Sequence, residues 1–178
     1  MFDREQVVRQ LAARVRSVPD FPAPGILFRD ITPILNDADS YRAAVDLFVE
    51  TWRSREVEVC AGIESRGFLF AAPLALALGT GFVPIRKSGK LPAAKFERSY
   101  ALEYGTATLE MHQDAVRPGQ RVLLLDDLLA TGGTAHAACQ LVESAGGRVL
   151  EVAFLIELTA LGGRQQLAGR TVTSFLRY

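Results

Sequence analysis

The chain has 178 residues, of which 49% are hydrophobic and 22% charged, and its 20 basic side chains balance 20 acidic ones. This length and composition fit one globular domain with a full core and exclude an intrinsically disordered chain. The charge balance argues against a nucleic-acid-binding surface, because such surfaces carry a clear excess of Lys and Arg.

Two features of the sequence predict a cytoplasmic protein with no membrane segment. The opening Met-Phe-Asp-Arg-Glu-Gln is charged where a signal peptide would be apolar. The longest apolar run, Phe68 to Leu78, is too short to span a membrane and contains Pro73. Cys60 and Cys139 are far apart in the sequence and lie in apolar surroundings, so we expect two reduced, buried thiols.

Hydrophobic periodicity predicts helices and strands that alternate along the chain. An amphipathic helix is expected at residues 4–18, and prolines separate it from an irregular apolar segment at residues 21–36. Further helices are expected at residues 40–53, 67–78 and 133–145. Strands are expected at residues 57–63, 82–86, 121–125, 148–156 and 172–176. Residues 95–112 alternate in short stretches around Tyr104-Gly105 and predict an antiparallel hairpin.

Strands that alternate with helices pair in parallel, so the pattern predicts an α/β fold. We expect a single Rossmann-like domain with a central, mostly parallel sheet flanked by helices. The sequence has no internal repeat or low-complexity linker that would divide it.

The most informative stretch is residues 122–134, Val-Leu-Leu-Leu-Asp-Asp-Leu-Leu-Ala-Thr-Gly-Gly-Thr. An apolar strand runs into two carboxylates and a short loop before a helix begins. Free N–H groups and the positive dipole end at a helix start bind phosphate. Gly132 and Gly133 allow a tight turn, while Thr131 and Thr134 add hydroxyl donors. The stretch therefore predicts a phosphate-binding loop.

Asp126 and Asp127 stand where open α/β sheets place their ligands. Beside a phosphate, two carboxylates are suited to accept hydrogen bonds from sugar hydroxyls or to orient a hydrated metal ion. The alternative, a helix cap followed by a plain turn, explains one Asp but neither the second Asp nor the paired glycines. A nucleotide hydrolase is excluded, since the chain has no G-x-x-x-x-G-K-[ST] sequence.

The basic residues are unevenly distributed. The three lysines of the chain, Lys87, Lys90 and Lys95, fall within nine residues, next to Arg86 and Arg98. Such a cluster in a neutral protein indicates either a site for an anionic small molecule or a solvated loop. By contrast, the two histidines, residues 112 and 136, lack the spacing of metal ligands.

Five segments together resemble the type I phosphoribosyltransferases, and among them the enzymes that use adenine. They are residues 21–33 (Phe-Pro-Ala-Pro-Gly-Ile-Leu-Phe-Arg-Asp-Ile-Thr-Pro), 64–68 (Glu-Ser-Arg-Gly-Phe), 86–92 (Arg-Lys-Ser-Gly-Lys-Leu-Pro), 99–105 (Ser-Tyr-Ala-Leu-Glu-Tyr-Gly) and 122–134. The resemblance implies one domain over residues 1–178, with a purine-binding hood within residues 1–36 and a flexible hairpin lid at residues 93–109. It also implies a homodimer, in which part of the basic cluster reaches the neighbouring site.

The reaction implied by the resemblance is a step of purine salvage. It transfers the 5-phosphoribosyl group of phosphoribosyl pyrophosphate to adenine and gives AMP and pyrophosphate. The implied cofactor is Mg²⁺, held mainly by substrate oxygens and without a direct protein ligand. Two alternatives remain: a phosphoribosyltransferase for another base, or a regulator that binds phosphoribosyl pyrophosphate without catalysis. The second would need a nucleic-acid-binding element, which the chain does not supply.

The resemblance also assigns roles to individual residues. The catalytic residues are Glu103, for acid-base work on adenine, and Arg66. The phosphoribosyl group is assigned to Asp126, Asp127, Ala130, Thr131, Gly132, Gly133 and Thr134. Pyrophosphate is assigned to Arg66, Arg86, Lys87 and Lys90. Adenine is assigned to Leu27, Phe28, Arg29 and Leu158.

Two further expectations concern segments that contact these sites. Tyr100 and Tyr104 are expected to close over the substrates with the lid and limit hydrolysis of the activated sugar. In the resembled family the turn at Ser65-Arg66-Gly67 can contain a cis peptide bond that does not involve proline. Glu64 stands at a position where Asp is also familiar.

Overall fold

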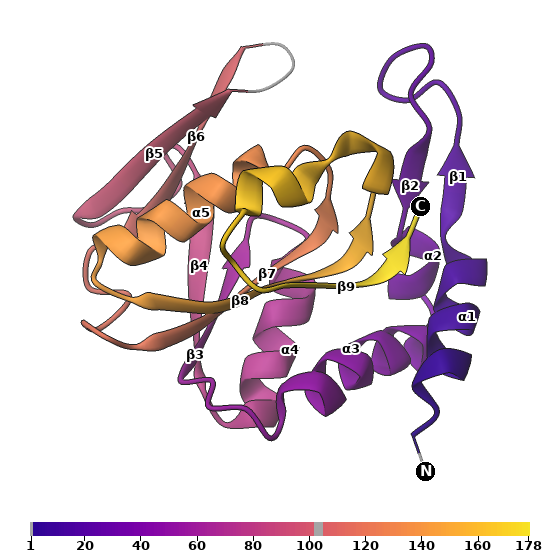
Figure 1. The fold of residues 1–178 in the computed structure, drawn as a ribbon, viewed down its shortest axis with the longest axis horizontal. Helices are drawn as coiled ribbons and strands as arrows, with labels where there is room; N and C mark the ends of the chain where they lie inside the picture. Colours follow the sequence, from indigo (N-terminus) through magenta and orange to yellow (C-terminus); the bar gives the residue numbers. More distant parts are fainter. Residues whose placement is uncertain (1, 102–104) are drawn as a thin grey trace. The chain divides into compact units, whose positions relative to one another are not determined.

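The computed structural model describes residues 2–101 and 105–178 (Figure 1). The chain divides into two compact units, Met1–Thr51 and Trp52–Tyr178. None of the helices in the described part of the chain has both the length and the apolar character that crossing a bilayer requires.

The first unit contains α1 (Arg4–Arg14), the two-stranded antiparallel pair β1 (Arg16–Val18) and β2 (Phe28–Asp30), α2 (Thr32–Leu35) and α3 (Ala38–Trp52). The Asp3 carboxylate caps α1 by accepting a hydrogen bond of 3.0 Å from the Gln6 N–H. The unit therefore begins with the predicted helix, but that helix is shorter than expected.

Two predictions for the first unit are wrong in part. The helix at residues 4–18 ends at Arg14, because Arg16–Val18 pairs with Phe28–Asp30 instead of continuing the helix. Across this pair the Arg16 guanidinium lies 2.5 Å from the Asp30 carboxylate. The segment at residues 21–36 is not irregular throughout, since it contains β2 and α2. Pairing between segments has overridden local helix preference here.

The second unit is built on a seven-stranded sheet in the order β5-β6-β4-β3-β7-β8-β9. Its five parallel strands are β3 (Val59–Ile63), β4 (Gly81–Lys87), β7 (Arg121–Leu129), β8 (Arg148–Glu157) and β9 (Val172–Arg177). The hairpin of β5 (Lys95–Ala101) and β6 (Thr106–His112) is antiparallel and joins the edge of the sheet at β4. The predicted α/β class, parallel sheet and hairpin are confirmed.

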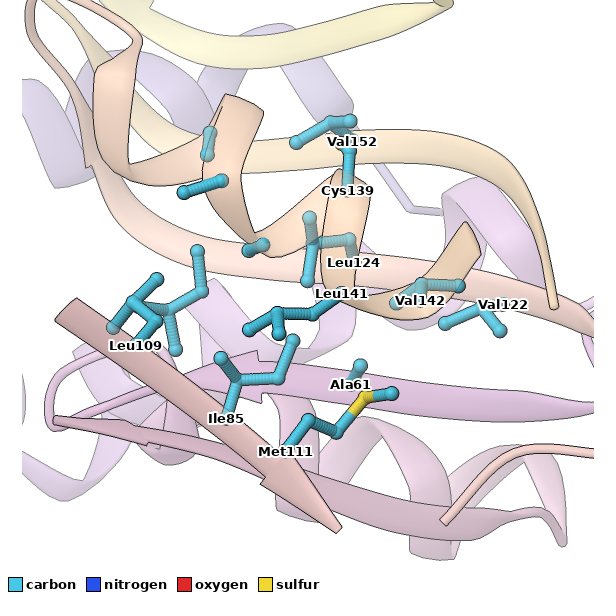
Figure 2. Packing of buried hydrophobic residues seen from close by; sticks show 14 of the residues in the cluster. Ala61, Ile85, Leu109, Met111, Val122, Leu124, Cys139, Leu141, Val142 and Val152 are labelled. Atoms are coloured by element: carbon cyan, nitrogen blue, oxygen red, sulfur yellow. The ribbon is translucent and has the colours of Figure 1, made fainter. Parts of the chain in front are cut away.

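Two helices cover opposite faces of this sheet. Helix α5 (Gly133–Ser144) packs on one face, where Leu141 and Val142 lie among buried residues that include Ile85 and Leu124 (Figure 2). Helix α4 (Phe68–Leu78) covers the other face, where Gly62 of β3 lies so close to Ala71 that an added Cβ would overlap it. The predicted helices at residues 67–78 and 133–145 are therefore confirmed, with ends that differ by one residue.

Two short segments complete the second unit. The 3₁₀ turns η1 (Thr159–Leu161) and η2 (Gly163–Leu167) follow β8 and were not predicted.

Cys60 and Cys139 are free and buried, and burial raises the pKa of each thiol to about 11. Both thiols are thus protonated near neutral pH, as expected for unreactive core cysteines.

Candidate functional site

A cavity of about 260 Å³ opens at the carboxyl ends of the parallel strands of the second unit. Open α/β sheets bind their ligands at this edge. The wall combines the turn after β3, the end of β4, one residue of β5 and the segment from β7 into α5. Its polar lining residues include Glu64, Ser65, Arg66, Lys87, Tyr100, Asp126, Asp127, Thr131 and Thr134.

The 130–134 loop, Ala130 to Thr134, connects β7 to α5 along one side of this cavity. Strand β7 extends to Leu129, four residues beyond the predicted end, so Asp126 and Asp127 lie inside the strand. Helix α5 begins at Gly133, and Gly132 stands at its N-cap with φ +88°. Only glycine adopts this backbone readily. The loop thus ends in the first amide groups of a helix, which is the predicted anion-binding arrangement.

The two aspartates and Arg66 form the charged centre of the cavity. The Arg66 Nε lies 2.8 Å from the Asp127 Oδ2, and the Asp127 N–H donates a hydrogen bond of 2.9 Å to the Asp126 Oδ1. Burial, together with the neighbouring Asp127 carboxylate, raises the pKa of Asp126. Burial also raises the pKa of Asp127, and the Arg66 guanidinium opposes that rise. The structure therefore brings together three predicted site residues, two from β7 and one from the turn after the adjacent strand β3.

The turn after β3 holds the second side of the cavity. Its Glu64–Ser65 peptide bond is cis, as the family resemblance led us to expect. Glu64 accepts two hydrogen bonds of 3.2 Å from Arg86 and one of 3.0 Å from the Lys87 N–H. The hydrogen bond from Arg86 is the main reason why the pKa of Glu64 is lowered. Arg86 also donates to the Lys90 carbonyl at 3.1 Å, so it links this turn to the loop after β4.

The basic residues differ in their relation to the cavity. Arg66 and Lys87 line it, whereas Arg86 and Lys90 do not. Lys95 is committed elsewhere, because its Nζ lies 2.8 Å from a Glu110 carboxylate oxygen.

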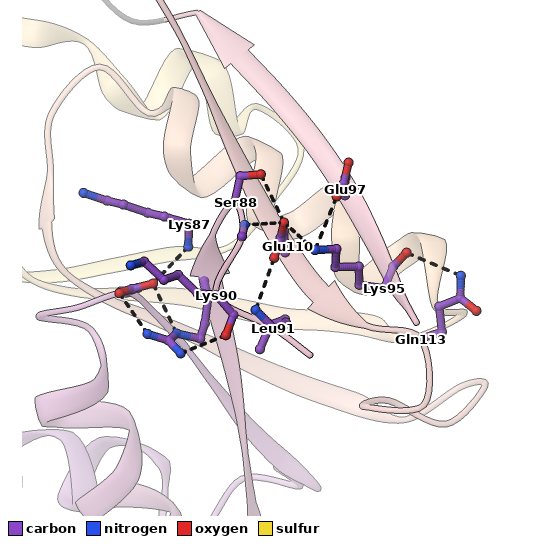
Figure 3. Close-up of polar contacts among 11 residues, drawn as sticks. Lys87, Ser88, Lys90, Leu91, Lys95, Glu97, Glu110 and Gln113 are labelled. Carbon is purple, nitrogen blue, oxygen red and sulfur yellow. Dashed lines mark hydrogen bonds and ion pairs between the residues drawn. The ribbon is translucent and has the colours of Figure 1, made fainter. Parts of the chain in front are cut away.

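Glu110 organises the loop that carries Lys87 and Lys90 (Figure 3). Its buried carboxylate accepts hydrogen bonds from the Ser88 hydroxyl at 3.1 Å, the Gly89 N–H at 2.7 Å and the Leu91 N–H at 3.4 Å. The hydrogen bond from Lys95 is the largest of several effects that lower the pKa of Glu110 to about 2. An ionised carboxylate on β6 therefore fixes the backbone of residues 88–91, the loop that follows Lys87 and contains Lys90.

Replacement of Glu110 by Gln is expected to remove a pH-dependent contribution to stability. Because the pKa of Glu110 falls from 4.5 to about 2 on folding, its contribution is full above pH 4.5 and is lost as pH falls toward 2. The denaturation midpoints of the parent and Glu110→Gln should differ most at pH 7, differ less at pH 3 and converge near pH 2. A constant difference at pH 7, 4 and 3 would show that Glu110 stabilises only by packing.

The remaining predicted residues lie outside this cavity or outside the described residues. Glu103 and Tyr104 belong to the part of the chain that the structure does not describe. The Leu158 N–H donates to the Leu129 carbonyl at 2.9 Å. Phe28 packs edge to face on Phe21, with ring centroids 5.2 Å apart.

The other residues assigned to adenine are in the first unit. Leu27 is 48% exposed, next to the exposed Ile26 and Phe21. Arg29 donates a hydrogen bond of 2.5 Å to the Ser17 hydroxyl. The tip of the β1–β2 hairpin thus presents an apolar surface, with a guanidinium held by the neighbouring strand.

Comparison with known proteins gives the family. Residues 32–168 match the model of the phosphoribosyl transferase domain. An adenine phosphoribosyltransferase of Chloroflexus aurantiacus is 53% identical over 96% of this chain and 98% of its own length. The chain belongs to the adenine phosphoribosyltransferase family.

Solved structures of the same family have the same fold. The enzyme of Thermoanaerobacter pseudethanolicus superposes with a TM-score of 0.93 at 49% identity, over 96% of this chain and 99% of that one. The enzyme of Saccharomyces cerevisiae, solved with adenine and an imino-altritol bisphosphate, gives a TM-score of 0.92 at 39% identity, over 97% and 99%. The type I phosphoribosyltransferase fold expected from the sequence is therefore confirmed.

The acidic side chains that the structure describes do not form a metal cage. Among residues 2–101 and 105–178, no group of three or more His, Cys, Asp or Glu side chains is placed to hold a metal ion. The cavity offers the adjacent Asp126 and Asp127, the second already paired with Arg66. This arrangement fits a Mg²⁺ ion that keeps most of its ligands from water and substrate.

Two features that shape the site, Glu110 and the segment after β8, were not predicted from the sequence. Both carry a detectable signal. Glu110 stands between Leu109 and Met111 in β6, and Glu157 ends the apolar run of β8, positions typical of buried, paired carboxylates. Gly162-Gly163 follows β8 much as Gly132-Gly133 follows β7.

Proposed function

We infer that the chain transfers the 5-phosphoribosyl group of phosphoribosyl pyrophosphate to adenine, giving AMP and pyrophosphate. The observation that carries this conclusion is the shared cavity of the 130–134 loop, the aspartate pair and Arg66, in a chain 53% identical to a curated adenine phosphoribosyltransferase. Such a reaction needs a site for the sugar phosphate, a site for the departing pyrophosphate and protection from water.

The 130–134 loop is proposed to hold the 5-phosphate through its main-chain amides and the hydroxyls of Thr131 and Thr134. Binding energy at this phosphate, remote from the reacting carbon, can orient the sugar for displacement. Asp126 and Asp127 are proposed to accept hydrogen bonds from the ribose hydroxyls. Their position beside the sugar also favours the positive charge that develops on the ring as the leaving group departs.

Arg66 and Lys87 are proposed to bind the departing pyrophosphate, because both line the cavity. A guanidinium grips phosphate oxygens in a bidentate manner, and an ammonium adds a point charge. Arg86 and Lys90 are proposed to support them from the loop fixed by Glu64 and Glu110. When bound through substrate oxygens, Mg²⁺ would neutralise charge on the pyrophosphate.

The base is proposed to lie against Leu27, Phe28, Arg29 and Leu158, within a hood formed by residues 1–36. The exposed apolar tip of the β1–β2 hairpin supports this assignment, since apolar faces hold a purine ring while main-chain groups read its edge. Residues 93–109 are proposed as a lid, supported by the position of Tyr100 on the cavity wall.

Glu103 is proposed as the acid-base residue for adenine, and Glu103→Gln should slow the chemical step. The amide keeps the size of the side chain but cannot accept the N9 proton, and general acid-base catalysis contributes about 10²- to 10⁴-fold. Single-turnover rates should fall within this range, while the affinity for ribose 5-phosphate stays near that of the parent. An unchanged single-turnover rate would remove Glu103 from the mechanism.

A homodimer is proposed, supported by helix α4. This helix is apolar on all sides, and Leu76 on it is 84% exposed in the single chain. An exposed apolar helix face marks an interaction surface. Light scattering should give the mass of two chains, and Leu76→Glu should shift the measured mass toward that of one chain.

A cytoplasmic location is also proposed, since the free Cys60 and Cys139 suit a reducing compartment.

The activity is tested by incubating the protein with phosphoribosyl pyrophosphate, Mg²⁺ and each purine or pyrimidine base in turn. Formation of AMP from adenine, with slower or no reaction of hypoxanthine, xanthine and orotate, is the expected result. A nucleotide formed only from another base would overturn the specificity. Tight binding of phosphoribosyl pyrophosphate with no product from any base would indicate a regulator.

A further inference from the structure

The segment after β8 packs directly behind the 130–134 loop. We call residues 158–167 the backing segment; it contains η1 and η2. A Cβ added to Gly132 would lie less than 3.0 Å from the Gly163 carbonyl oxygen, and one added to Gly163 would lie less than 3.0 Å from the Ala130 carbonyl oxygen. Real Cβ atoms essentially never come this close. Two glycine backbones therefore interlock at this point.

Position 163 requires glycine because neighbouring atoms leave no room for a Cβ. A Cβ there would also lie 2.9 Å from Leu129 Cδ1, at the end of β7. Gly163 is buried and does not line the 260 Å³ cavity. Any side chain at this position must push on the 130–134 loop from behind.

Two hydrogen bonds extend the contact on either side of this interlock. The Leu158 N–H donates to the Leu129 carbonyl at 2.9 Å, before the 130–134 loop. After the loop, the His136 ring Nδ1 lies 2.9 Å from the Gln166 carbonyl oxygen, which requires a proton on Nδ1. The backing segment thus holds the end of β7, the loop and the first turn of α5.

Arg164 fixes the backing segment to the sheet. Its guanidinium donates to both oxygens of Glu157, at 2.7 and 2.8 Å, and to the Val172 carbonyl at 2.9 Å. It also donates to the Ser174 hydroxyl at 3.1 Å, and Ser174 in turn donates to Glu157. Glu157 is only 5% exposed. These hydrogen bonds join the backing segment to the end of β8 and the start of β9 with little freedom to shift.

We propose that Gly163 and Arg164 are positioning residues for the sugar-phosphate site. They set the curvature of the 130–134 loop from behind and so determine the affinity for the 5-phosphate, without contact with the substrate. The proposal rests on the inferred role of the 130–134 loop in binding that phosphate. Misplacement of a binding group by about 1 Å can cost about 10²-fold in rate, so a small shift of the loop is sufficient.

The test measures two ligands that use different parts of the site. Ribose 5-phosphate probes the 130–134 loop, and inorganic pyrophosphate probes Arg66 and Lys87. For Gly163→Ala, calorimetry should show the dissociation constant of ribose 5-phosphate raised about 10- to 100-fold and that of pyrophosphate changed less than about twofold. The KM for phosphoribosyl pyrophosphate should rise while the KM for adenine stays constant.

Arg164→Lys provides a second variant, because it keeps the charge beside Glu157 but cannot reproduce the planar set of four hydrogen bonds. Arg164→Lys should also weaken the binding of ribose 5-phosphate and leave that of pyrophosphate nearly unchanged, with a smaller effect than Gly163→Ala. Gly169→Ala and Arg170→Lys are matched controls. Gly169 has φ +81° in open space, and Arg170 pairs with Glu143 at the far end of α5. Both should bind ribose 5-phosphate as the parent does, even where their thermal stability is lower.

Unchanged binding of ribose 5-phosphate by folded Gly163→Ala would overturn the proposal. Equal weakening of both ligands would overturn it as well, since that result indicates general disruption. If Gly163→Ala does not fold, Arg164→Lys decides by the same two criteria. Failure of the parent protein to form AMP would instead contradict the proposed function, because the binding measurements do not depend on turnover.

Discussion

Asp127→Asn is expected to lower kcat by about 10²- to 10³-fold, the usual cost of removing one preorganised electrostatic group from an active site. The amide keeps the shape of the side chain and can still meet a ribose hydroxyl. It lacks the negative charge that faces the developing positive charge of the ring, and it no longer holds Arg66, whose Nε lies 2.8 Å from the carboxylate. Steady-state kinetics with saturating substrates measures the effect.

Stability should change far less than activity in Asp127→Asn. Burial raises the pKa of Asp127, so its ionised form is less favourable in the folded than in the unfolded chain. At neutral pH the burial of this charge disfavours folding. Removing the charge therefore offsets the stability lost with the ion pair to Arg66. The exposed Asp114→Asn is the charge-matched control, with parental kinetics expected. Activity that falls only in proportion to the folded fraction would assign Asp127 a structural role.

Elements of the fold were predictable where one segment carries a repeated pattern. Helices α3 and α5 show an apolar period, α4 and the strand β3 are continuous apolar runs, and the alternation of strand and helix leads to a parallel sheet. Elements of three or four residues, such as β1, β2 and α2, have no room for a period. The existence of β1 and β2 depends on pairing between Arg16–Val18 and Phe28–Asp30 across a nine-residue loop, which local propensity does not reveal.

The candidate site shows the same division. The strand, the aspartates and the 130–134 loop are contiguous in the sequence, so their chemistry could be read there directly. The supports of the site join distant segments. Glu110 holds residues 88–95, and the 3₁₀ turns at residues 159–167 lie behind residues 129–136. The sequence shows Glu110 and Glu157 beside apolar strand residues, but only the structure identifies the loops that they fix.

Gly132→Val is the second large effect, and it should abolish capture of phosphoribosyl pyrophosphate. Valine at φ +88° is strained, at a cost of about 1–3 kcal/mol. Its Cβ would also overlap the Gly163 carbonyl oxygen and the Gln166 Cβ, at a further cost of about 1–3 kcal/mol. Domains of this kind have about 5–15 kcal/mol of stability. We therefore expect Gly132→Val to remain folded at low temperature, with its 130–134 loop displaced.

Ligand-induced stabilisation separates this loss of binding from a loss of folding. A ligand at 100 times its dissociation constant stabilises the folded state by about 2.7 kcal/mol. Phosphoribosyl pyrophosphate should therefore raise the Tm of the parent and leave that of Gly132→Val unchanged. Gly119→Val is the matched control, because Gly119 has φ +77° with open space around its Cβ position. Gly119→Val has a similar backbone strain but should keep the ligand-induced rise in Tm. A rise of parental size in Gly132→Val would mean that the 130–134 loop does not hold the 5-phosphate, and the assignment of the sugar-phosphate site would be wrong.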